Sequence, residues 1–213
     1  MGKMLVSFLF ALAGTLVFMT ILRRMKRKND IFIPLVGMML GGIIDSITTF
    51  FAYRLDMIQN IGSWLMGNFS MVMQGRYELL YLSVPLLVLA WIFAHRFTIA
   101  GMGEDFAKGL GLNYQLVMNV GVGIVAMISA LVIITVGRIP FLGLVVPNVV
   151  TMFHGDHLRK NIAPTALLGS VFLLVSDIVG RIVIHPYEIP IGLTVGVIGS
   201  FVFLYLVFRS QRS

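Results

Sequence analysis

The stretch RIPFLGLVVPNVVTMFHGDHLRK, residues 138–160, decides how this chain is organised. Its apolar part, Phe141–Phe153, is shorter than the roughly 20 residues that a regular helix needs to cross a bilayer. It also contains Pro147, and it lies between Arg138 and a Gly-Asp-His turn. Whether this stretch crosses the membrane decides on which side every later loop lies.

Six longer apolar segments flank this stretch. They are Met4–Leu22, Ile31–Tyr53, Leu79–His95, Leu116–Val136, Thr165–Val183 and Ile189–Phe208. Of the 213 residues, 58% are hydrophobic and only 12% are charged, whereas soluble globular proteins are about 45–50% apolar and about 25% charged. The bilayer must therefore solvate most side chains. We predict an all-α, polytopic membrane helix bundle of about seven spans, with residues 1–213 forming a single transmembrane domain.

The basic residues indicate that Phe141–Phe153 crosses the membrane. With seven crossings and an outside N-terminus, 11 of the 16 lysines and arginines lie inside and 5 lie outside; without this crossing each side holds 8. Because basic residues concentrate in cytoplasmic loops, seven crossings are favoured. The inside set is Arg23, Arg24, Lys26, Arg27, Lys28, Arg96, Lys108, Arg159, Lys160, Arg209 and Arg212, and the outside set is Lys3, Arg54, Arg76, Arg138 and Arg181. Pro147 lacks a backbone N–H and is expected to kink or break its helix.

The N-terminal segment Leu5–Thr20 looks like a signal peptide, but it is followed by a basic cluster and lacks a small-residue cleavage site. We therefore predict that it is a retained span. An outside N-terminus without a signal indicates that an odd number of spans precedes this chain. We assign the net charge of +7 to basic loops and not to nucleic-acid binding. Cysteine is absent, which excludes disulfides and thiolate metal sites. His154, Asp156 and His157 lack a fourth ligand, so we predict neither a metal site nor a cofactor.

A short amphipathic helix is predicted in the inside loop HRFTIAGMGEDFAKGLGLN, residues 95–113. Its signals are an acidic first turn, an i,i+4 ion pair, two apolar residues on one face and a terminal glycine. Glu104 and Asp105 form the acidic first turn, and Glu104 is paired with Lys108. Phe106 and Leu110 are the two apolar residues, Gly111 is the terminal glycine, and Gly103 precedes the helix. The helix either docks a cytosolic partner or lies on the membrane surface and merely connects two spans.

Asp177 and Arg181 stand four residues apart on one face of a predicted span. Ionisable groups at membrane depth usually pair with one another, so we expect an ion pair that locks neighbouring helices rather than contacts a substrate. Glu188, in the loop that follows, is expected either to meet an outside partner or to stay hydrated. The last span carries small residues at Gly192, Gly196 and Gly199, which favour close helix packing.

A polar stripe marks the second span. Asp45 lies in its middle, after Gly37 and Gly41, which allow close packing. The hydroxyl residues that follow are Ser46, Thr48 and Thr49. The stripe suits a water-lined path, although Asp45 could instead bond to a neighbouring helix.

The second half of the chain carries five motifs in order: GEDFAKGLGLN, IPFLGLVVPN, GDHLRK, SDIVGR and EIPIGLTVGVIG. Together with a weaker tryptophan-glycine segment, Trp64–Asn68, they resemble the FecCD/BtuC-type permeases, the membrane subunits of type II ABC importers. The resemblance covers nearly the whole chain. Asn148 and Thr151 replace a histidine and an arginine of many members, and Ser200–Phe201 lacks their proline. With these replacements the chain is more similar to the subgroup that handles catecholate or related siderophores than to the vitamin B12 permeases.

The resemblance implies ten spans and a cytoplasmic N-terminus, so this chain corresponds to spans four to ten, as an N-terminally truncated permease. The inside helix would dock on a cytosolic ABC ATPase dimer through Gly103, Glu104, Phe106, Ala107, Lys108, Leu110 and Gly111. The second and last spans would line a path at the interface with a second permease copy or paralogue. The path and packing residues would be Gly37, Gly41, Asp45, Ser46, Thr49, Pro147, Asn148, Gly192, Gly196 and Gly199. Arg54 and Arg76 are candidates for docking an extracytoplasmic substrate-binding protein.

The function implied is the permease subunit of an ATP-driven importer that moves ferric siderophores across the cell inner membrane into the cytoplasm. The chain lacks a Gly-x-x-x-x-Gly-Lys-Ser/Thr motif, so a separate subunit would hydrolyse ATP and this chain would not be an enzyme. Two alternatives stay open. One is a proton-coupled secondary transporter that uses Asp45 and Asp177, and the other is a non-functional permease fragment.

Overall fold

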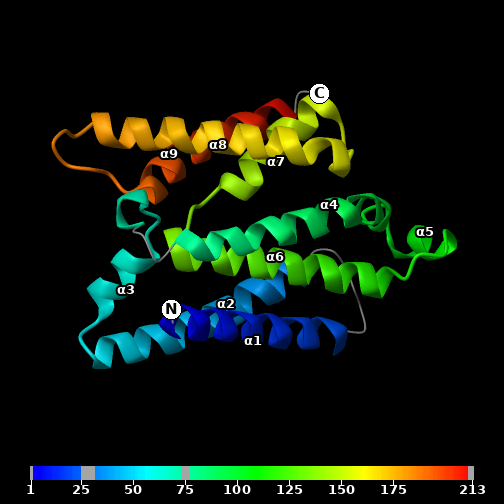
Figure 1. Ribbon diagram of the computed structural model, residues 1–213, viewed down its shortest axis with the longest axis horizontal. Coiled ribbons are helices and arrows are strands. Elements are labelled where there is room, and N and C mark those ends of the chain that lie inside the picture. Colours follow the sequence, from blue (N-terminus) through cyan, green and yellow to red (C-terminus); the bar gives the residue numbers. More distant parts are fainter. Residues whose placement is uncertain (1, 25–31, 73–76, 211–213) are drawn as a thin grey trace.

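The computed structural model describes residues 2–24, 32–72 and 77–210, and within these ranges the chain is helical and forms no β-strand. The long helices are α1 (Gly2–Arg24), α2 (Phe32–Arg54), α4 (Ser83–Ala100), α6 (Tyr114–Val136), α7 (Leu142–His154), α8 (Leu158–Ile182) and α9 (Ile191–Ser210). The short helices are α3 (Ile58–Leu65), α5 (Glu104–Gly109) and two 3-10 turns, η1 (Phe69–Met71) and η2 (Tyr77–Leu82). The predicted all-α fold is confirmed (Figure 1).

The described helices pack as two groups. Helices α1, α2, α4 and α6 form the first group, and α7, α8 and α9 form the second, with α4 packed on α8 between them (Figure 1). The α1 C-terminus, α5 and the α7–α8 turn lie at one end, here called the basic end. The N-terminus, α3 and the α8–α9 connection lie at the opposite end, here called the junction end (Figure 1). The described members of the two predicted sets of basic residues thus lie toward opposite ends of the bundle.

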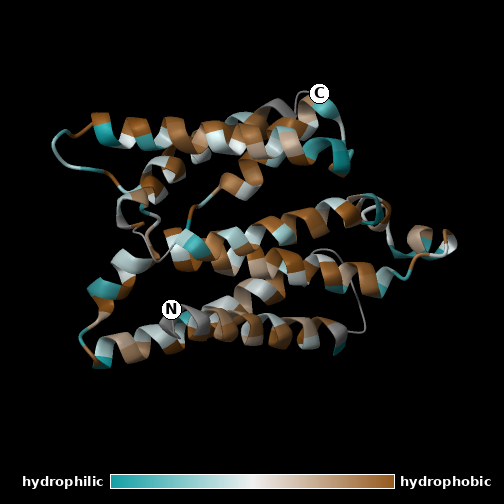
Figure 2. Cartoon of the chain, in the orientation of Figure 1, coloured by the Kyte–Doolittle hydropathy of each residue, from teal (hydrophilic) through white to brown (hydrophobic). Residues whose placement is uncertain are grey.

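Five helical segments among the described residues are long and apolar enough to cross a bilayer: Pro34–Arg54, Tyr77–Ala100, Tyr114–Val136, Leu158–Ile182 and Ile191–Phe208. Two shorter apolar segments, Val6–Leu22 in α1 and Leu142–His154 in α7, accompany them. Figure 2 shows hydrophobic residues along the helices and hydrophilic residues near the ends. The count of seven spans stays a prediction.

The span predicted at Leu79–His95 has different helical bounds. A 3-10 turn occupies its start, and α4 continues past His95 to Ala100. A charged residue does not end a helix, because backbone hydrogen bonding continues beyond the apolar region. Arg96 therefore lies on α4, with its guanidinium carbon 5.0 Å from the centre of the Phe93 ring.

The predicted break at Pro147 is wrong in one respect, because α7 runs uninterrupted from Leu142 to His154. The amide of Asn148 donates a 2.6 Å hydrogen bond to the Leu144 carbonyl, which supports the turn around the proline. The irregular backbone lies just before α7, at residues 137–141, where Phe141 has a left-handed φ of 62°.

The described helices bury few side chains within this chain. The largest fully buried ones include Val117 and Leu131 in α6 and Ile191 and Val195 in α9. Residues 41–51 of α2 are all exposed. Since α2 packs only on α1 and α3 among the main contacts, its remaining surface must be covered by lipid or by another chain.

Candidate functional site

The predicted short helix is present as α5 at the basic end, and both of its ends are closed by local geometry. Gly103 is its N-cap residue, and Lys108 Nζ lies 2.9 Å from Glu104 Oε1. The Gly111 N–H donates to the Lys108 carbonyl and the Leu112 N–H donates to the Ala107 carbonyl. With Gly111 at φ 76°, these two bonds form a Schellman motif. The sequence signals at 103–111 therefore account for the helix.

The surface of α5 is divided into an anchored and a free side. Ala107 is fully buried, and α5 packs on α4 and α6. Phe106 is 49% exposed and Leu110 is 59% exposed. Ala107, predicted as a coupling residue, therefore holds the helix in place, whereas Phe106 and Leu110 lie on its exposed surface.

The Glu104–Lys108 pair has a defined electrostatic consequence. The hydrogen bond and the charge of Glu104 raise the pKa of Lys108 above its ordinary value. Because the folded-state pKa is the higher one, the stabilisation by the pair is present below the ordinary lysine pKa for as long as Glu104 is ionised, and it is lost as pH rises through the raised pKa of Lys108. The ion pair is therefore intact at neutral pH.

Three glycines that are far apart in sequence meet at the junction end. Gly67, Gly137 and Gly192 belong to the segment after α3, the end of α6 and the start of α9. A Cβ on Gly192 would lie 3.0 Å from the Gly67 backbone nitrogen, and one on Gly67 would lie 2.6 Å from the Arg138 carbonyl oxygen. The junction has room only for glycine at these positions.

Backbone hydrogen bonds close this glycine junction. The Asn68 N–H donates to the Val136 carbonyl at 2.9 Å, and the Arg138 N–H donates to the Leu65 carbonyl at 2.9 Å. The Gly192 N–H donates to the Gly67 carbonyl at 3.0 Å. Sequence reasoning singled out Gly192 but missed Gly67 and Gly137 as contacts. The available signals were the tryptophan-glycine segment and a glycine placed directly after the α6 apolar run.

Two further glycines of α9 face the irregular segment before α7. A Cβ on Gly196 would lie 3.5 Å from Pro140 Cγ, and one on Gly199 would lie 2.8 Å from Phe141 Cβ. With Gly192 they form one face of α9 that receives residues 138–141. In α2, a Cβ on Gly37 would lie 3.6 Å from the Phe18 ring, whereas Gly41 has no neighbour within 4 Å among the described residues.

A chain of polar side chains also lies at the junction end. Arg181 Nε lies 2.9 Å from Asp177 Oδ2, and Arg181 Nη1 lies 3.0 Å from Glu188 Oε1. The Ser70 hydroxyl donates to the other oxygen of Glu188. Sequence reasoning foresaw the Asp177–Arg181 pair. It left Glu188 to a partner or to water, whereas here Glu188 links the α8–α9 connection to η1.

The polar stripe of α2 lies on an open surface. Asp45, Ser46 and Thr49 are exposed, and Ser46 Oγ donates to the Gly42 carbonyl at 2.8 Å. No hydrogen bond or ion pair to Asp45 is seen within the described ranges. Arg54 is exposed at the end of α2, and Arg76 lies outside the described residues.

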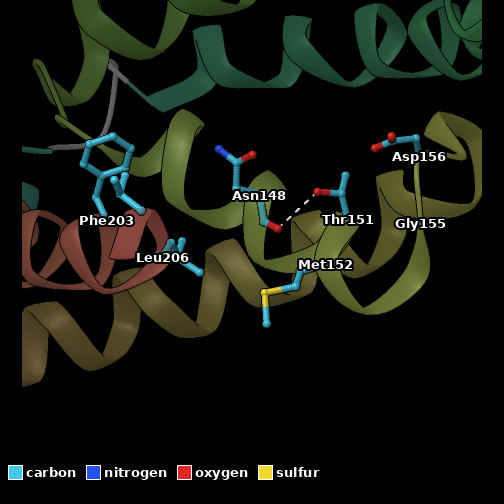
Figure 3. Close-up of a pocket in the computed structure, with 8 residues that line it drawn as sticks. Asn148, Thr151, Met152, Gly155, Asp156, Phe203 and Leu206 are labelled. Atoms are coloured by element: carbon cyan, nitrogen blue, oxygen red, sulfur yellow. Dashed lines mark hydrogen bonds between the residues drawn. The ribbon is translucent and has the colours of Figure 1, made fainter. Parts of the chain in front are cut away.

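A cavity of about 440 Å3 lies between α7 and α9 near the basic end. Figure 3 shows Asn148, Thr151 and Met152 from α7 facing Phe203 and Leu206 from α9. Thr151 Oγ1 donates to the Asn148 carbonyl at 3.1 Å. Asn148 thus lines a hollow beside α9, but the predicted path helices α2 and α9 belong to different helix groups of this chain.

No group of three or more His, Cys, Asp or Glu side chains with metal-binding geometry occurs in the part of the chain that the structure describes. His154, Asp156 and His157 all lie at the exposed α7–α8 turn. The described residues therefore form a short helix with an exposed apolar surface, a closely packed glycine junction and long apolar helices.

Sequence comparison places this arrangement among known proteins. Residues 1–209 match the model of the FecCD transport family. The chain is 58% identical over 209 residues to the petrobactin import system permease protein YclN of Bacillus subtilis (strain 168), covering 98% of this chain and 66% of that protein. It is 37% identical over 211 residues to the ferric-anguibactin transport system permease protein FatD of Vibrio anguillarum, covering 99% and 67%. The chain spans about two thirds of the length of these relatives.

The fold also matches a solved structure. An inward-facing metal-chelate type ABC transporter superposes with a TM-score of 0.75 at 23% sequence identity, covering 98% of this chain and 64% of that chain. At this sequence identity the match shows that the two chains share a fold, and no more. Together with the family match over nearly all of the sequence, it identifies the chain as a member of the FecCD transport family.

Proposed function

We propose that this chain acts as the permease subunit of an ATP-driven importer that moves ferric siderophores across the plasma (inner) membrane into the cytoplasm. The observation that carries the proposal is α5, an anchored helix with an exposed apolar surface at the basic end of a FecCD-family chain. The names of the relatives at 58% and 37% identity favour a siderophore over vitamin B12 as cargo.

The mechanism follows from how α5 is attached. A cytosolic ABC ATPase dimer would bind the exposed Phe106 and Leu110, and closure of the dimer on ATP would displace α5. Because α5 packs on both α4 and α6, its displacement moves both helices at their basic ends. The glycine junction at the other end holds α6, α9 and the α3 segment together, so it acts as the fixed point of that movement.

The remaining partners follow from surfaces that this chain leaves open. The exposed stripe of α2 around Asp45 would face a second permease copy or paralogue, with α9 completing the path. Arg54 at the junction end would meet acidic groups of an extracytoplasmic substrate-binding protein, and Arg76 remains a candidate for the same role. The Asp177–Arg181 pair would serve a structural role there.

The orientation is tested by single-cysteine labelling, for which the cysteine-free sequence is suited. We expect Gly109→Cys in α5 to be protected from a membrane-impermeant thiol reagent added to intact cells, and Gln59→Cys in α3 to react. Both positions are exposed, and Gly109 has no neighbour within 4 Å, so neither change perturbs packing. Labelling of Gly109→Cys from outside would invert the topology and end the importer proposal.

The energy source separates this proposal from a proton-coupled transporter. Asp45 is the acidic residue within α2, and Asp177 is already paired with Arg181. We expect uptake of a radiolabelled ferric siderophore, measured with the cognate ATPase and binding protein present, to stop when ATP is depleted. It should persist in the Asp45→Asn variant and in the presence of a protonophore. Uptake that follows the proton gradient and requires Asp45 would favour the secondary transporter.

The fragment hypothesis is tested in the same assay. Uptake by the 213-residue chain is compared with uptake by a fusion that adds the part of YclN that this chain does not match. Activity of the fusion alone would mean that the chain transports only as part of a longer permease.

A further inference from the structure

The short helix α5 and the predicted path helix α9 belong to different groups of the bundle. Helix α5 packs on α4 and α6, whereas α9 packs on α7 and α8. A movement of α5 must therefore cross between the groups to reach α9 within this chain. The glycine junction connects the groups at the fixed end, and the packing of α4 on α8 connects them elsewhere. The contact between α4 and α8 is therefore the one that can carry the movement.

One side-chain interaction joins α4 to α8 toward the basic end. Arg159 lies in the first turn of α8, and its guanidinium carbon is 4.5 Å from the centre of the Trp91 ring on α4. An indole ring is the best aromatic partner for a cation. Within the described ranges, no hydrogen bond or ion pair connects α4 with α8, and Arg159 has no carboxylate partner. The aromatic face is therefore the partner of this guanidinium.

A cavity of about 430 Å3 borders this contact, between α4, α7 and α8. Leu87 of α4 and Ile162 and Ala166 of α8 are among the residues that line it. Leu87 is one helical turn from Trp91, and Ile162 and Ala166 are one and two turns from Arg159, so the cavity and the contact follow the same helix faces. Because the cavity reduces direct packing between these faces, the contact of Arg159 with Trp91 ties α4 to α8 there.

The turn that carries Arg159 is firmly connected to α7. Asn161 is only 5% exposed, and its Nδ2 donates a 2.6 Å hydrogen bond to the carbonyl of Gly155, the C-cap of α7. The end of α7 and the first turns of α8 are thus held together. A displacement of Arg159 therefore carries the basic ends of both helices on which α9 packs.

We propose that Trp91 and Arg159 are positioning residues that transmit the displacement of α4 to α8 and thereby to α9. At the opposite end of α8, the Gly180 carbonyl accepts a 3.2 Å hydrogen bond from the Ile189 N–H, which holds that end beside the glycine junction. Arg159 lies about 30 Å along the helix from Gly180, so it acts where α8 can move furthest. The inference rests on the proposed function, because it assigns the route by which the ATPase acts on the path.

The test measures how many ATP molecules are hydrolysed for each radiolabelled ferric siderophore taken up. The permease is reconstituted with its cognate ATPase and binding protein, as the 213-residue chain or as the fusion described above, whichever transports. Arg159→Gln and Trp91→Leu should each raise this ratio about two- to fivefold, as expected for loss of an exposed cation–π contact. Arg159→Lys and Trp91→Phe, which keep a cation and a ring, should raise it less. The double variant should match the single ones, because both changes remove one shared contact.

The ratio separates transmission from folding. A purely structural role would lower the amount of working complex, which reduces hydrolysis and uptake in proportion and leaves their ratio unchanged. Arg96→Gln is the matched control, since the Arg96 guanidinium carbon lies 5.0 Å from the centre of the Phe93 ring, within α4 alone. This variant should keep the ratio of the unmodified permease.

A covalent link should replace the contact. Trp91→Cys with Arg159→Cys, in a chain without other cysteines, should show the raised ratio, and a bifunctional thiol reagent that joins the two positions should restore it. An unchanged ratio in Arg159→Gln, an equal rise in Arg96→Gln, or a ratio that stays high after the link has formed would overturn the inference alone, provided that the unmodified permease transports. Failure of the unmodified permease to transport would instead contradict the proposed function, and this inference with it.

Discussion

Replacing Gly137 by alanine will destabilise the folded chain by about 2–6 kcal/mol, the sum of backbone strain and overpacking. Gly137 has φ 95°, a conformation that side chains other than glycine rarely adopt. Its added Cβ would also lie 2.8 Å from the Met66 carbonyl oxygen and 2.9 Å from Gly67 Cα, both of them backbone atoms. The hydrogen bonds that close the junction on either side of residue 137 would be lost with the displacement.

The measurement is thermal unfolding of the purified chain in lipid nanodiscs, together with the yield of folded protein. Gly143→Ala is the matched control, since Gly143 lies in α7 with no atom within 4 Å of the added Cβ. Alanine is also the better helix former there by about 1 kcal/mol. Equal melting temperatures for the two variants would show that the junction does not require a glycine at position 137.

The double replacement Phe106→Ala and Leu110→Ala should reduce siderophore uptake by about 10- to 100-fold while the helix bundle stays folded. The estimate takes each exposed apolar side chain as an interface anchor worth about 0.7–1.4 kcal/mol, which is about 1.4–2.8 kcal/mol for the two together. The bonds that close α5 come from the backbone and from the Glu104–Lys108 pair, so neither replacement removes them. Loss of uptake would therefore report the contact with the ATPase.

Two readouts separate docking from folding. Co-purification of the ATPase should weaken together with uptake, whereas the melting temperature should change little. The matched control is Leu9→Ala with Phe10→Ala, a pair of the same composition on α1 whose side chains are 62% and 74% exposed. Wild-type uptake by the α5 variant, or an equal loss in the α1 variant, would contradict the coupling role of α5.

The sequence predicted those features that arise within short windows of the chain. Apolar runs of bilayer length predict the main helices, because unsatisfied backbone groups are too costly in hydrocarbon for other conformations. Gly103 and Gly111 with the i,i+4 pair predict α5, since caps and neighbouring turns act locally. The Asp177–Arg181 pair follows from the same spacing rule.

Other features could not be predicted from short windows. The end of α4 at Ala100 and the continuity of α7 through Pro147 depend on hydrogen bonding that charge and proline alone do not determine. Glu188 reaches Ser70, which is 118 residues away in sequence. Nothing near Glu188 in the sequence marks that partner.

The sequence by itself therefore determined the all-helical membrane fold, the segregation of basic loops and the short helix at 104–109. The tertiary structure alone decided the junction of Gly67, Gly137 and Gly192, the cavity beside Asn161 and the open surface of α2. The physical reason is the range of the interactions. Helix formation and capping involve residues within about four positions of each other, whereas close backbone approach and cavities arise only when distant segments pack together.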